Sequence, residues 1–400
     1  MAALTLPDAP WRRRAGLTTL TDALGVGNAR FVGGAVRDTL LGLDVADVDI
    51  ATSLPPEDVV EAVRRAGLKA VPTGIAHGTI TAVLPSGPVE VTTLRRDVAT
   101  DGRHATVAFT DDWRGDASRR DFTINALYAD PTTSEVVDYF GGLADLADRR
   151  VRFIGDPLRR IAEDHLRILR FFRFLARFGN SPDADALAAC TARARDLMAL
   201  SRERIADELR KLLVARDAVA VVRRMIDRDI LLPVLPEITP TGVDRMAALA
   251  EREAASGIAP HAIRRLASLL PADRAINDAV GARLRLSNAE RKRLASAIEE
   301  IGSEGPHALG YRIGLDAATD RLLLSGEGVA PLAEWTPPTL PITGGALVER
   351  GVQRGPQVAW LLREIETRWI AEGFPDAERT ARIADEAVAQ LLIDDSNRNA

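Results

Sequence analysis

The sequence predicts an α+β protein in which a small head built on a mixed sheet is followed by an all-helical neck, body and tail. Before residue 150, runs of glycine and β-branched residues bounded by turn residues predict strands. Beyond residue 150, apolar residues recur at helical spacing and strand signals nearly vanish. A chain of 400 residues also exceeds the size of one hydrophobic core, so we expect several domains.

We expect four segments along the chain: an N-terminal segment at residues 1–27, the head at 28–150, the neck at 151–225, and the body and tail at 226–400. The head is expected to contain a helix, a β-hairpin and a mobile loop, in that order, at residues 57–66, 78–94 and 95–104. The neck and the start of the body are expected to contain helices at residues 159–178, 184–198, 204–215 and 218–226.

Two aspartates in the stretch FVGGAVRDTLLGLDVADVDI, residues 31–50, are spaced i, i+2. Because side chains alternate across a strand, Asp47 and Asp49 are expected to point to the same face. Neighbouring carboxylates repel each other unless a cation lies between them. Mg²⁺ typically takes one or two carboxylates and leaves positions for substrate phosphates. An isolated pair of this kind is more often a solvated strand end or turn, so the context decides.

The glycines that precede this pair favour a phosphate site. Gly33 and Gly34 follow a short apolar run and precede a helix-like segment at residues 35–41. Tandem glycines let backbone N–H groups approach a phosphate closely, and a helix N-terminus adds positive potential. Arg37, about one turn into that helix, can reach the same anion. The stretch therefore predicts a metal and nucleoside triphosphate site.

Four blocks of sequence resemble, in the same order, the motifs of the class II tRNA nucleotidyltransferase and bacterial poly(A) polymerase family. Residues 33–38 (GGAVRD) with residues 47–49 (DVD) resemble the first motif. Residues 119–127 (RRDFTINAL) resemble the second motif, and residues 163–170 (EDHLRILR) resemble the nucleotide-selecting motif. Residues 200–209 (LSRERIADEL) resemble the helical element that braces it. One such block is weak evidence, but four in order are specific.

The resemblance implies a polymerase-β-like head and the template-independent addition or repair of the 3′-terminal CCA of tRNA. The ribose 3′-hydroxyl at the acceptor end of tRNA would attack the α-phosphate of CTP or ATP and release pyrophosphate. Three alternatives stay open. They are a poly(A) polymerase, an enzyme that adds only the A or only the CC part, and a catalytically inactive RNA-binding relative.

The resemblance also implies roles for individual residues. Asp47 and Asp49 would hold Mg²⁺, and Asp164 with Arg167 would select the base. The implied nucleotide-binding residues are Gly33, Gly34, Arg37, Arg120, Asp164, Arg167, Arg170 and Arg173. Arg120 suits the triphosphate because a planar guanidinium matches phosphate oxygens. Asp121 and Asn125 are expected to hold their loop together, or to contact the sugar, rather than do chemistry. Without the resemblance, Arg119-Arg120-Asp121 is equally an ordinary surface ion pair.

Glu90 is a candidate third catalytic carboxylate. It lies in a predicted strand between Val89 and Val91, where an acid is poorly placed unless that face of the strand is solvated. A solvent-exposed strand face explains the alternation equally well. The functional hypothesis is that Glu90 faces Asp47 and Asp49 from a neighbouring strand. It would then complete the metal site or help deprotonate the ribose hydroxyl.

The block around Asp164 is suited to reading a nucleobase. On one continuous helix, Asp164, Arg167 and Arg170 fall within about 120° of arc and share a face. An aspartate accepts from an exocyclic amine, and an arginine donates to a ring nitrogen or carbonyl. Cytosine and adenine both carry an amine beside an acceptor nitrogen, so such a pair would accept CTP and ATP. The spacing alone also fits ion pairs along a solvated helix. Arg173 lies nearly opposite Asp164 and is included on the resemblance.

Composition limits the classes of protein that the chain can belong to. A single cysteine, Cys190, excludes a disulfide framework and a cysteine-based metal cluster. We expect a cytoplasmic protein with no membrane partner, because no apolar run approaches the ~20 residues of a membrane span and no signal core begins the chain. The net charge of −5 is unusual for an RNA-binding protein. However, residues 149–180 contain nine arginines and only three acidic residues, which suffices for one positive face.

Overall fold

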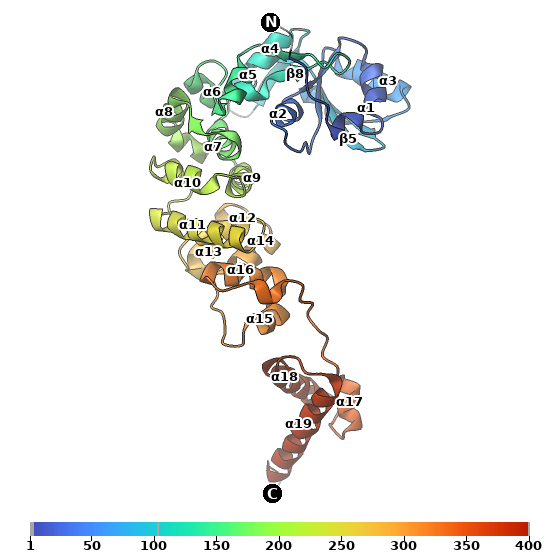
Figure 1. Ribbon diagram of the computed structural model, residues 1–400, viewed down its shortest axis with the longest axis vertical. Helices are drawn as coiled ribbons and strands as arrows, with labels where there is room; N and C mark the ends of the chain where they lie inside the picture. Colours follow the sequence, from blue (N-terminus) through green and yellow to red (C-terminus); the bar gives the residue numbers. More distant parts are fainter. Residues whose placement is uncertain (1–3, 102–103, 399–400) are drawn as a thin grey trace. The chain divides into compact units, whose positions relative to one another are not determined.

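The computed structural model describes residues 4–101 and 104–398 (Figure 1). It divides into two compact units, Met1–Pro240 and Thr241–Ala400. The first unit contains the sheet together with the helices up to α10 (Figure 1). The second unit contains helices α11 to α19, except that the first residue of α11, Pro240, belongs to the first unit. The finer division into head, neck, body and tail stays a prediction.

A seven-stranded mixed sheet forms the centre of the head, with strand order β3-β4-β5-β2-β1-β8-β9. Its strands are β1 (Ala29–Val32), β2 (Asp49–Thr52), β3 (Lys69–Gly74), β4 (Thr79–Leu84), β5 (Gly87–Thr93), β8 (Leu127–Ala129) and β9 (Val136–Asp138). Strands β2 and β5 run parallel, and the remaining neighbours are antiparallel. The predicted hairpin is confirmed as β4 and β5, whose register pairs Leu84 with Gly87.

Short helices accompany this sheet: α1 (Leu17–Leu24), α2 (Gly34–Leu40), α3 (Pro56–Arg65), α4 (Trp113–Ser118) and α5 (Gly142–Ala147). Helix α3 confirms the predicted helix and begins with proline, followed by Glu57 and Asp58 in its first turn. Both features suit a helix N-terminus, where N–H groups lack partners and the dipole favours negative charge. Single 3₁₀ turns lie at Pro10–Arg13, Ile75–His77 and Thr123–Asn125.

The predicted mobile loop at residues 95–104 is wrong. Residues on either side of the undescribed pair 102–103 form an antiparallel ladder between β6 (Arg95–Asp101) and β7 (His104–Phe109). The polar composition suggested a loop, but Val98, Thr100, Thr106 and Val107 are β-branched and favour extended backbone. A paired ladder satisfies the backbone N–H and carbonyl groups whatever the polarity of the side chains.

The helices that follow the head are α6 (Pro157–Glu163), α7 (Arg167–Phe178), α8 (Ala184–Ala192), a 3₁₀ turn (Ala194–Ala199), α9 (Arg202–Leu213) and α10 (Ala218–Ile226). A short parallel pair, β10 (Arg150–Val151) and β11 (Ser181–Pro182), lies beside them. The single helix predicted at 159–178 is two helices, because Asp164 is extended at φ −153°, ψ 106°. Its carboxylate accepts a hydrogen bond from the Leu166 N–H at 3.1 Å. Such local bonds compete with the helix.

Aromatic side chains join α7 to the head. Phe171 and Phe174 contact Phe122, which lies in the block at residues 119–127, at ring-centroid distances of 6.4 and 5.4 Å. Phe153 stacks on Phe171 at 5.9 Å. Helix α7 also packs against α9 and α10. A buried aromatic core therefore anchors α7 against the head.

Helices are the regular secondary structure of the second unit in its described residues. Its helices are α11 (Pro240–Ala255), α12 (Ala262–Leu269), α13 (Arg274–Arg283), α14 (Asn288–Ala297), α15 (Pro306–Ile313), α16 (Leu315–Ser325), α17 (Gly344–Glu349), α18 (Pro356–Ala371) and α19 (Ala377–Arg398), with a 3₁₀ turn at Ala330–Leu332. One buried apolar cluster includes Leu322 and another includes Leu361. Within residues 4–101 and 104–398, no helix combines the length and apolarity that a membrane span requires. The cytoplasmic location stays a prediction.

Candidate active site

A cleft of about 500 Å³ in the first unit brings together most of the residues that the sequence singled out. Eight predicted site residues line it: Gly33, Gly34, Arg37, Asp49, Arg120, Asp164, Arg167 and Arg170. The other lining residues are Arg95, Arg119, Asp121, Asn125 and Phe174. Three predicted residues, Asp47, Glu90 and Arg173, are not among those that line it. Six arginines and three aspartates make the cleft suited to an anion.

The glycine turn lies between β1 and α2. Gly33 has φ +67°, a conformation that side chains rarely adopt, and it caps the helix that Gly34 begins. A Cβ at Gly34 would lie 3.7 Å from Nη2 of Arg37. The turn and the arginine are therefore adjacent, as the sequence predicted.

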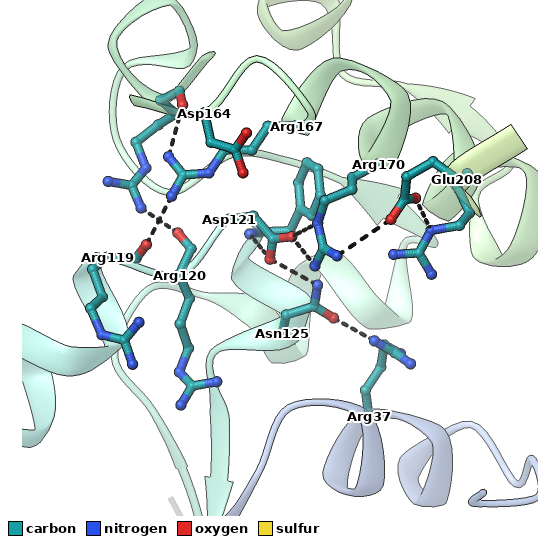
Figure 2. Close-up of polar contacts among 12 residues, drawn as sticks. Arg37, Arg119, Arg120, Asp121, Asn125, Asp164, Arg167, Arg170 and Glu208 are labelled. Carbon is teal, nitrogen blue, oxygen red and sulfur yellow. Dashed lines mark hydrogen bonds and ion pairs between the residues drawn. The ribbon is translucent and has the colours of Figure 1, made fainter. Parts of the chain in front are cut away.

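Arg37 is buried and held from both sides. Its Nε donates to Asp38 Oδ1 at 2.7 Å, and its Nη1 donates to Asn125 Oδ1 (Figure 2). Its guanidinium also lies 4.5 Å from the ring centroid of Phe178. Burial lowers the pKa of Arg37 from its ordinary value, although Asp38 opposes that shift. The side chain is thus a fixed guanidinium at the glycine turn.

The acidic residues lie where the start of β2 pairs with the middle of the parallel strand β5. Asp49 begins β2 and is in register with Glu90 on β5. Asp49 is half-buried, whereas Asp47 and Glu90 are exposed. Burial raises the pKa of Asp49, the negative charges of Glu90 and Asp47 raise it further, and Arg120 opposes the shift. The predicted position of Glu90 beside Asp49 is confirmed, while its catalytic role stays a prediction.

The pair Asp47 and Asp49 fits a hard divalent cation. Their oxygens are ligands that Mg²⁺ prefers, and a cation would relieve the repulsion that raises the pKa of Asp49. In the described part of the chain, no group of three or more His, Cys, Asp and Glu side chains could hold a metal ion. Two carboxylates nevertheless suffice where substrate phosphates supply further oxygens.

Sequence reasoning missed Asp116, a residue of α4 that is 1% exposed. Its carboxylate accepts from Arg119 Nε at 2.8 Å, Arg120 Nη2 at 3.1 Å and the Tyr128 hydroxyl at 2.8 Å. Arg120 Nε also donates to the Tyr128 hydroxyl at 3.1 Å. Burial acts to raise the pKa of Asp116, but Arg120 and Arg119 together hold it below its ordinary value. Its spacing of three and four residues from the arginines was the signal available in the sequence.

Asp121 and Asn125 hold their loop together, as predicted. Oδ1 of Asp121 accepts from the Phe122 N–H and from Asn125 Nδ2, both at 2.9 Å. Its Oδ2 accepts from Arg170 Nε at 2.7 Å (Figure 2). Although burial acts to raise the pKa of Asp121, Arg170 and these hydrogen bonds lower it to about 2.

Asp164 and Arg167 line the cleft but do not share a helix face, because Asp164 lies in the turn between α6 and α7. Asp164 Oδ2 instead accepts from Arg204 Nη2 of α9 at 2.8 Å. Arg167 pairs with Glu163 and donates through Nη1 to the Arg160 carbonyl at 2.8 Å. The predicted helix-face geometry is therefore wrong.

Glu208 of α9 connects the remaining arginines. It is 4% exposed and accepts from Arg173 Nε at 2.6 Å, while Arg170 Nη1 lies 3.8 Å from its other oxygen (Figure 2). Arg173 pairs with Glu208 and is not among the residues that line the cleft, and its role in nucleotide binding stays a prediction. The block at residues 200–209 thus supplies Arg204 and Glu208 as partners for Asp164, Arg170 and Arg173.

Two family models match the chain. The model described as Poly A polymerase head domain matches residues 29–152. The model described as Probable RNA and SrmB- binding site of polymerase A matches residues 181–241.

Relatives and solved structures match along almost the whole chain. The human mitochondrial CCA tRNA nucleotidyltransferase 1 is 35% identical over 386 residues, covering 90% of this chain and 87% of that protein. The CCA-adding enzyme of Levilactobacillus brevis is 31% identical over 380 residues, covering 89% and 92%.

Among solved structures, the CCA-adding enzyme of Bacillus stearothermophilus in complex with CTP superposes with a TM-score of 0.74 at 25% identity, covering 98% of this chain and 100% of that chain. The Thermotoga maritima CCA-adding enzyme complexed with tRNA has a TM-score of 0.69 at 21% identity, covering 98% and 100%, and supports the fold alone. The fold, the cleft and the extent of these matches agree, and the chain belongs to the CCA-adding tRNA nucleotidyltransferase and poly(A) polymerase family of enzymes.

Proposed function

We propose that this protein adds or repairs the 3′-terminal CCA of tRNA without a template, using CTP and ATP and releasing pyrophosphate. One observation carries the proposal. A single cleft joins the glycine turn, Asp49, Arg120 and the Asp164–Arg167 segment, in a chain whose relatives are named CCA-adding enzymes. The acceptor end of tRNA is the proposed substrate. The solved relatives include complexes with CTP, ATP and tRNA.

The triphosphate is proposed to bind at the glycine turn. The turn allows close approach of phosphate oxygens, because neither Gly33 nor Gly34 carries a side chain. The Gly33 N–H is bonded to the Leu127 carbonyl at 3.2 Å, so Gly34 is the proposed backbone donor. Arg37 and Arg120 face the same cleft and supply charged donors that match phosphate oxygens. Since Asn125, Asp116 and Tyr128 already hold both guanidiniums, little conformational entropy is lost when the nucleotide binds.

Asp47 and Asp49 are proposed to hold Mg²⁺. When bound, the ion would activate the ribose 3′-hydroxyl and offset the charge on the transferring phosphoryl group and its leaving oxygen. Glu90, in register with Asp49, is proposed to complete the ligand set or to accept the hydroxyl proton.

Asp164 and Arg167 are proposed to read the base edge. Arg204 and the Leu166 N–H occupy part of the Asp164 carboxylate, but a carboxylate has about four lone-pair positions, so acceptor capacity remains for an exocyclic amine. Arg167 is held against Glu163 and the Arg160 carbonyl, which orients its guanidinium. Cytosine and adenine match this acceptor and donor, whereas uracil and guanine present a carbonyl where the amine is required.

A second concave surface in the same unit is proposed to contact the RNA backbone. A hollow of about 810 Å³ lies over α10 and is lined by four arginines, Arg216, Arg223, Arg224 and Arg228, and by Asp217 and Asp227. Arg216 pairs with Asp217 at 2.8 Å. The excess of positive charge suits phosphates, which position RNA without reading its sequence.

A tRNA transcript that lacks CCA, incubated with each labelled nucleoside triphosphate alone and in pairs, tests the function. We expect CTP alone to add two residues, ATP alone to add none, and both together to complete CCA. A long product with ATP alone would instead identify a poly(A) polymerase. Addition of only CC or only A would identify a partial enzyme, and RNA binding without incorporation would identify a non-catalytic relative.

Variants of the acidic pair test the metal assignment. Asp47→Ala and Asp49→Ala should abolish incorporation while RNA affinity stays within about twofold, because phosphate contacts supply most of that affinity. Asp44→Ala, an exposed acid three residues earlier in the chain, is the matched control and should keep full activity. Incorporation near the wild-type rate in either test variant would contradict the assignment.

A further inference from the structure

The buried side chain of Phe174 on α7 lies among three guanidinium groups. Its ring centroid is 4.2 Å from Cζ of Arg173, 5.2 Å from that of Arg37 and 5.5 Å from that of Arg170. Arg37 comes from α2 in the head, whereas the other two arginines share α7 with the ring. Arg37, Arg170 and Phe174 all line the cleft. One aromatic ring therefore connects two cleft arginines that come from different segments of the chain.

An aromatic face attracts a guanidinium within about 6 Å because the ring carries negative charge density on its faces. This attraction uses none of the N–H donors of the arginine. Arg37 therefore keeps its bonds to Asp38 and Asn125, and Arg170 keeps its bond to Asp121. The ring also lessens repulsion in a crowded positive cluster, in which burial and the charges of Arg177 and Arg173 all lower the pKa of Arg37.

The orientation of the ring is itself fixed. Phe122, in the block at residues 119–127, meets it edge to face at a centroid distance of 5.4 Å and an interplanar angle of 72°. Phe178, one turn later on α7, stacks on it at 6.0 Å and 19°. Aromatic contacts from both the head and the helix thus hold the ring in place, so it can fix the guanidiniums around it.

We propose that Phe174 is a positioning residue for nucleotide binding, whose ring holds Arg37 and Arg170 in the arrangement that a nucleoside triphosphate requires. The proposal rests on the proposed function of the cleft. Since Arg37 lies at the glycine turn and not at Asp164, the effect acts on CTP and ATP alike. Phe174 therefore affects how tightly a nucleotide binds and leaves the choice between bases unchanged.

Substitutions that remove the ring test the proposal. Phe174→Leu and Phe174→Met keep an apolar side chain without an aromatic face, and both should raise KM for CTP and ATP about five- to tenfold. We expect kcat within about threefold of wild type and an unchanged preference between CTP and ATP. Phe174→Tyr retains the aromatic face and should stay within about twofold of wild type in KM. Two ring-free variants are used so that poor folding of one still leaves a measurement.

Phe171→Leu is the matched control. Phe171 lies on the same helix, is fully buried, and contacts Phe122, Phe153 and Phe172. This variant should lose thermal stability as Phe174→Leu does, yet keep the wild-type KM. If both ring-free variants at Phe174 kept KM within twofold of wild type, Phe174 would be an ordinary core residue and the proposal would be wrong.

Equilibrium binding of CTP and ATP separates this proposal from the proposed function. If the wild type bound both nucleotides but added neither to tRNA, the proposed function would be wrong. The nucleotide affinities of the Phe174 variants would then still test whether Phe174 positions the arginines. If the wild type bound neither nucleotide, both proposals would be wrong.

Discussion

At the scale of single residues, most arginines of the cleft are paired with acids, some one helical turn away and one 49 positions away in the chain. Asp116 holds Arg119 and Arg120, Asp121 holds Arg170, and Glu163 holds Arg167. A guanidinium that is already bonded to a buried acid is stabilised in one orientation. We therefore expect the acids that do no chemistry to affect how well these arginines bind a nucleotide.

Asp116→Asn tests this dependence. An amide offers one acceptor oxygen where the carboxylate offers two, so Arg119 and Arg120 compete for it. We expect KM for both nucleotides to rise about tenfold, measured by steady-state incorporation. Asp112→Asn is the control, because Asp112 caps the same helix and asparagine caps equally well. Equal KM values for both variants would show that Asp116 is only structural.

Base selection is the second test at this scale. Asp164→Ala removes the proposed acceptor for the exocyclic amine and should increase UMP or GMP incorporation about ten- to a hundredfold. Arg204→Ala should move selectivity in the same direction by less, since it frees the Asp164 carboxylate without deleting it. Arg202→Ala, on the same helix, should keep wild-type selectivity. If the Asp164→Ala variant still excluded UMP and GMP as the wild type does, other residues would have to select the base.

The third residue-scale prediction concerns acid stability. The folded-state pKa of Asp121 is about 2, below the ordinary value near 3.9. Because the folded pKa is depressed, its stabilisation is complete above about pH 4 and is lost as the pH falls towards 2. The advantage of the wild type over Asp121→Asn in urea unfolding should shrink by about 1 kcal/mol between pH 5 and pH 3. If the difference in unfolding free energy between the wild type and Asp121→Asn were the same at pH 5 and pH 3, the depressed pKa of Asp121 would be contradicted.

At the scale of elements, buried ion pairs join helices of the second unit. Asp320 of α16 is fully buried and accepts from Arg264 Nη1 of α12 at 3.1 Å and from Arg293 Nε of α14 at 2.6 Å. Glu253 of α11 accepts from Arg264 Nε at 2.8 Å. Two acids thus connect four helices through charge-assisted bonds, and the removal of either leaves a buried guanidinium short of a partner.

Asp320→Ala should therefore destabilise the second unit by about 3–5 kcal/mol, measured by chemical denaturation. Asp316→Ala, an exposed acid one turn earlier on α16, should cost less than about 1 kcal/mol. At a temperature where Asp320→Ala remains folded, its rate of nucleotide incorporation should equal that of the wild type, because the cleft of the first unit is unchanged. A loss of stability that is equal in both variants would show that the buried network contributes little.

At the scale of the whole molecule, acidic composition and RNA binding are compatible because the positive charge is concentrated. The chain carries a net charge of −5, yet residues 149–180 hold nine arginines and the hollow over α10 is lined by four more. Counterion release from RNA depends on the local contacts and not on the net charge of the protein.

The salt dependence of tRNA binding tests this distribution. Log affinity should fall linearly with log salt concentration, and the double variant Arg224→Ala, Arg228→Ala should weaken binding and reduce the slope by about one to two. The control pair, Arg64→Ala with Lys69→Ala, removes two exposed charges from α3 and β3 and should leave the slope unchanged. Affinity that is insensitive to salt, or equal competition by unstructured RNA, would favour a general tailing enzyme.

The sequence by itself determined the features that depend on local spacing. The glycine turn with Arg37, the two-residue spacing of Asp47 and Asp49, the β4–β5 hairpin and helix α10 follow from neighbours along the chain. Side-chain periodicity and turn chemistry act over a few residues, so they can be read without the fold. The order of the four motif blocks also indicated the family to which the chain belongs.

Only the tertiary structure decided which side chains meet. The Asp164 side chain at the break between α6 and α7 pairs with Arg204, which lies 40 positions away, and the β6–β7 ladder depends on backbone pairing that polar composition conceals. Asp116, Phe174 and Glu208 became relevant only when the fold placed their arginines around one cleft. Interactions between residues about 40 to 140 positions apart leave no local pattern, because their geometry is set by the packing of the elements that carry them.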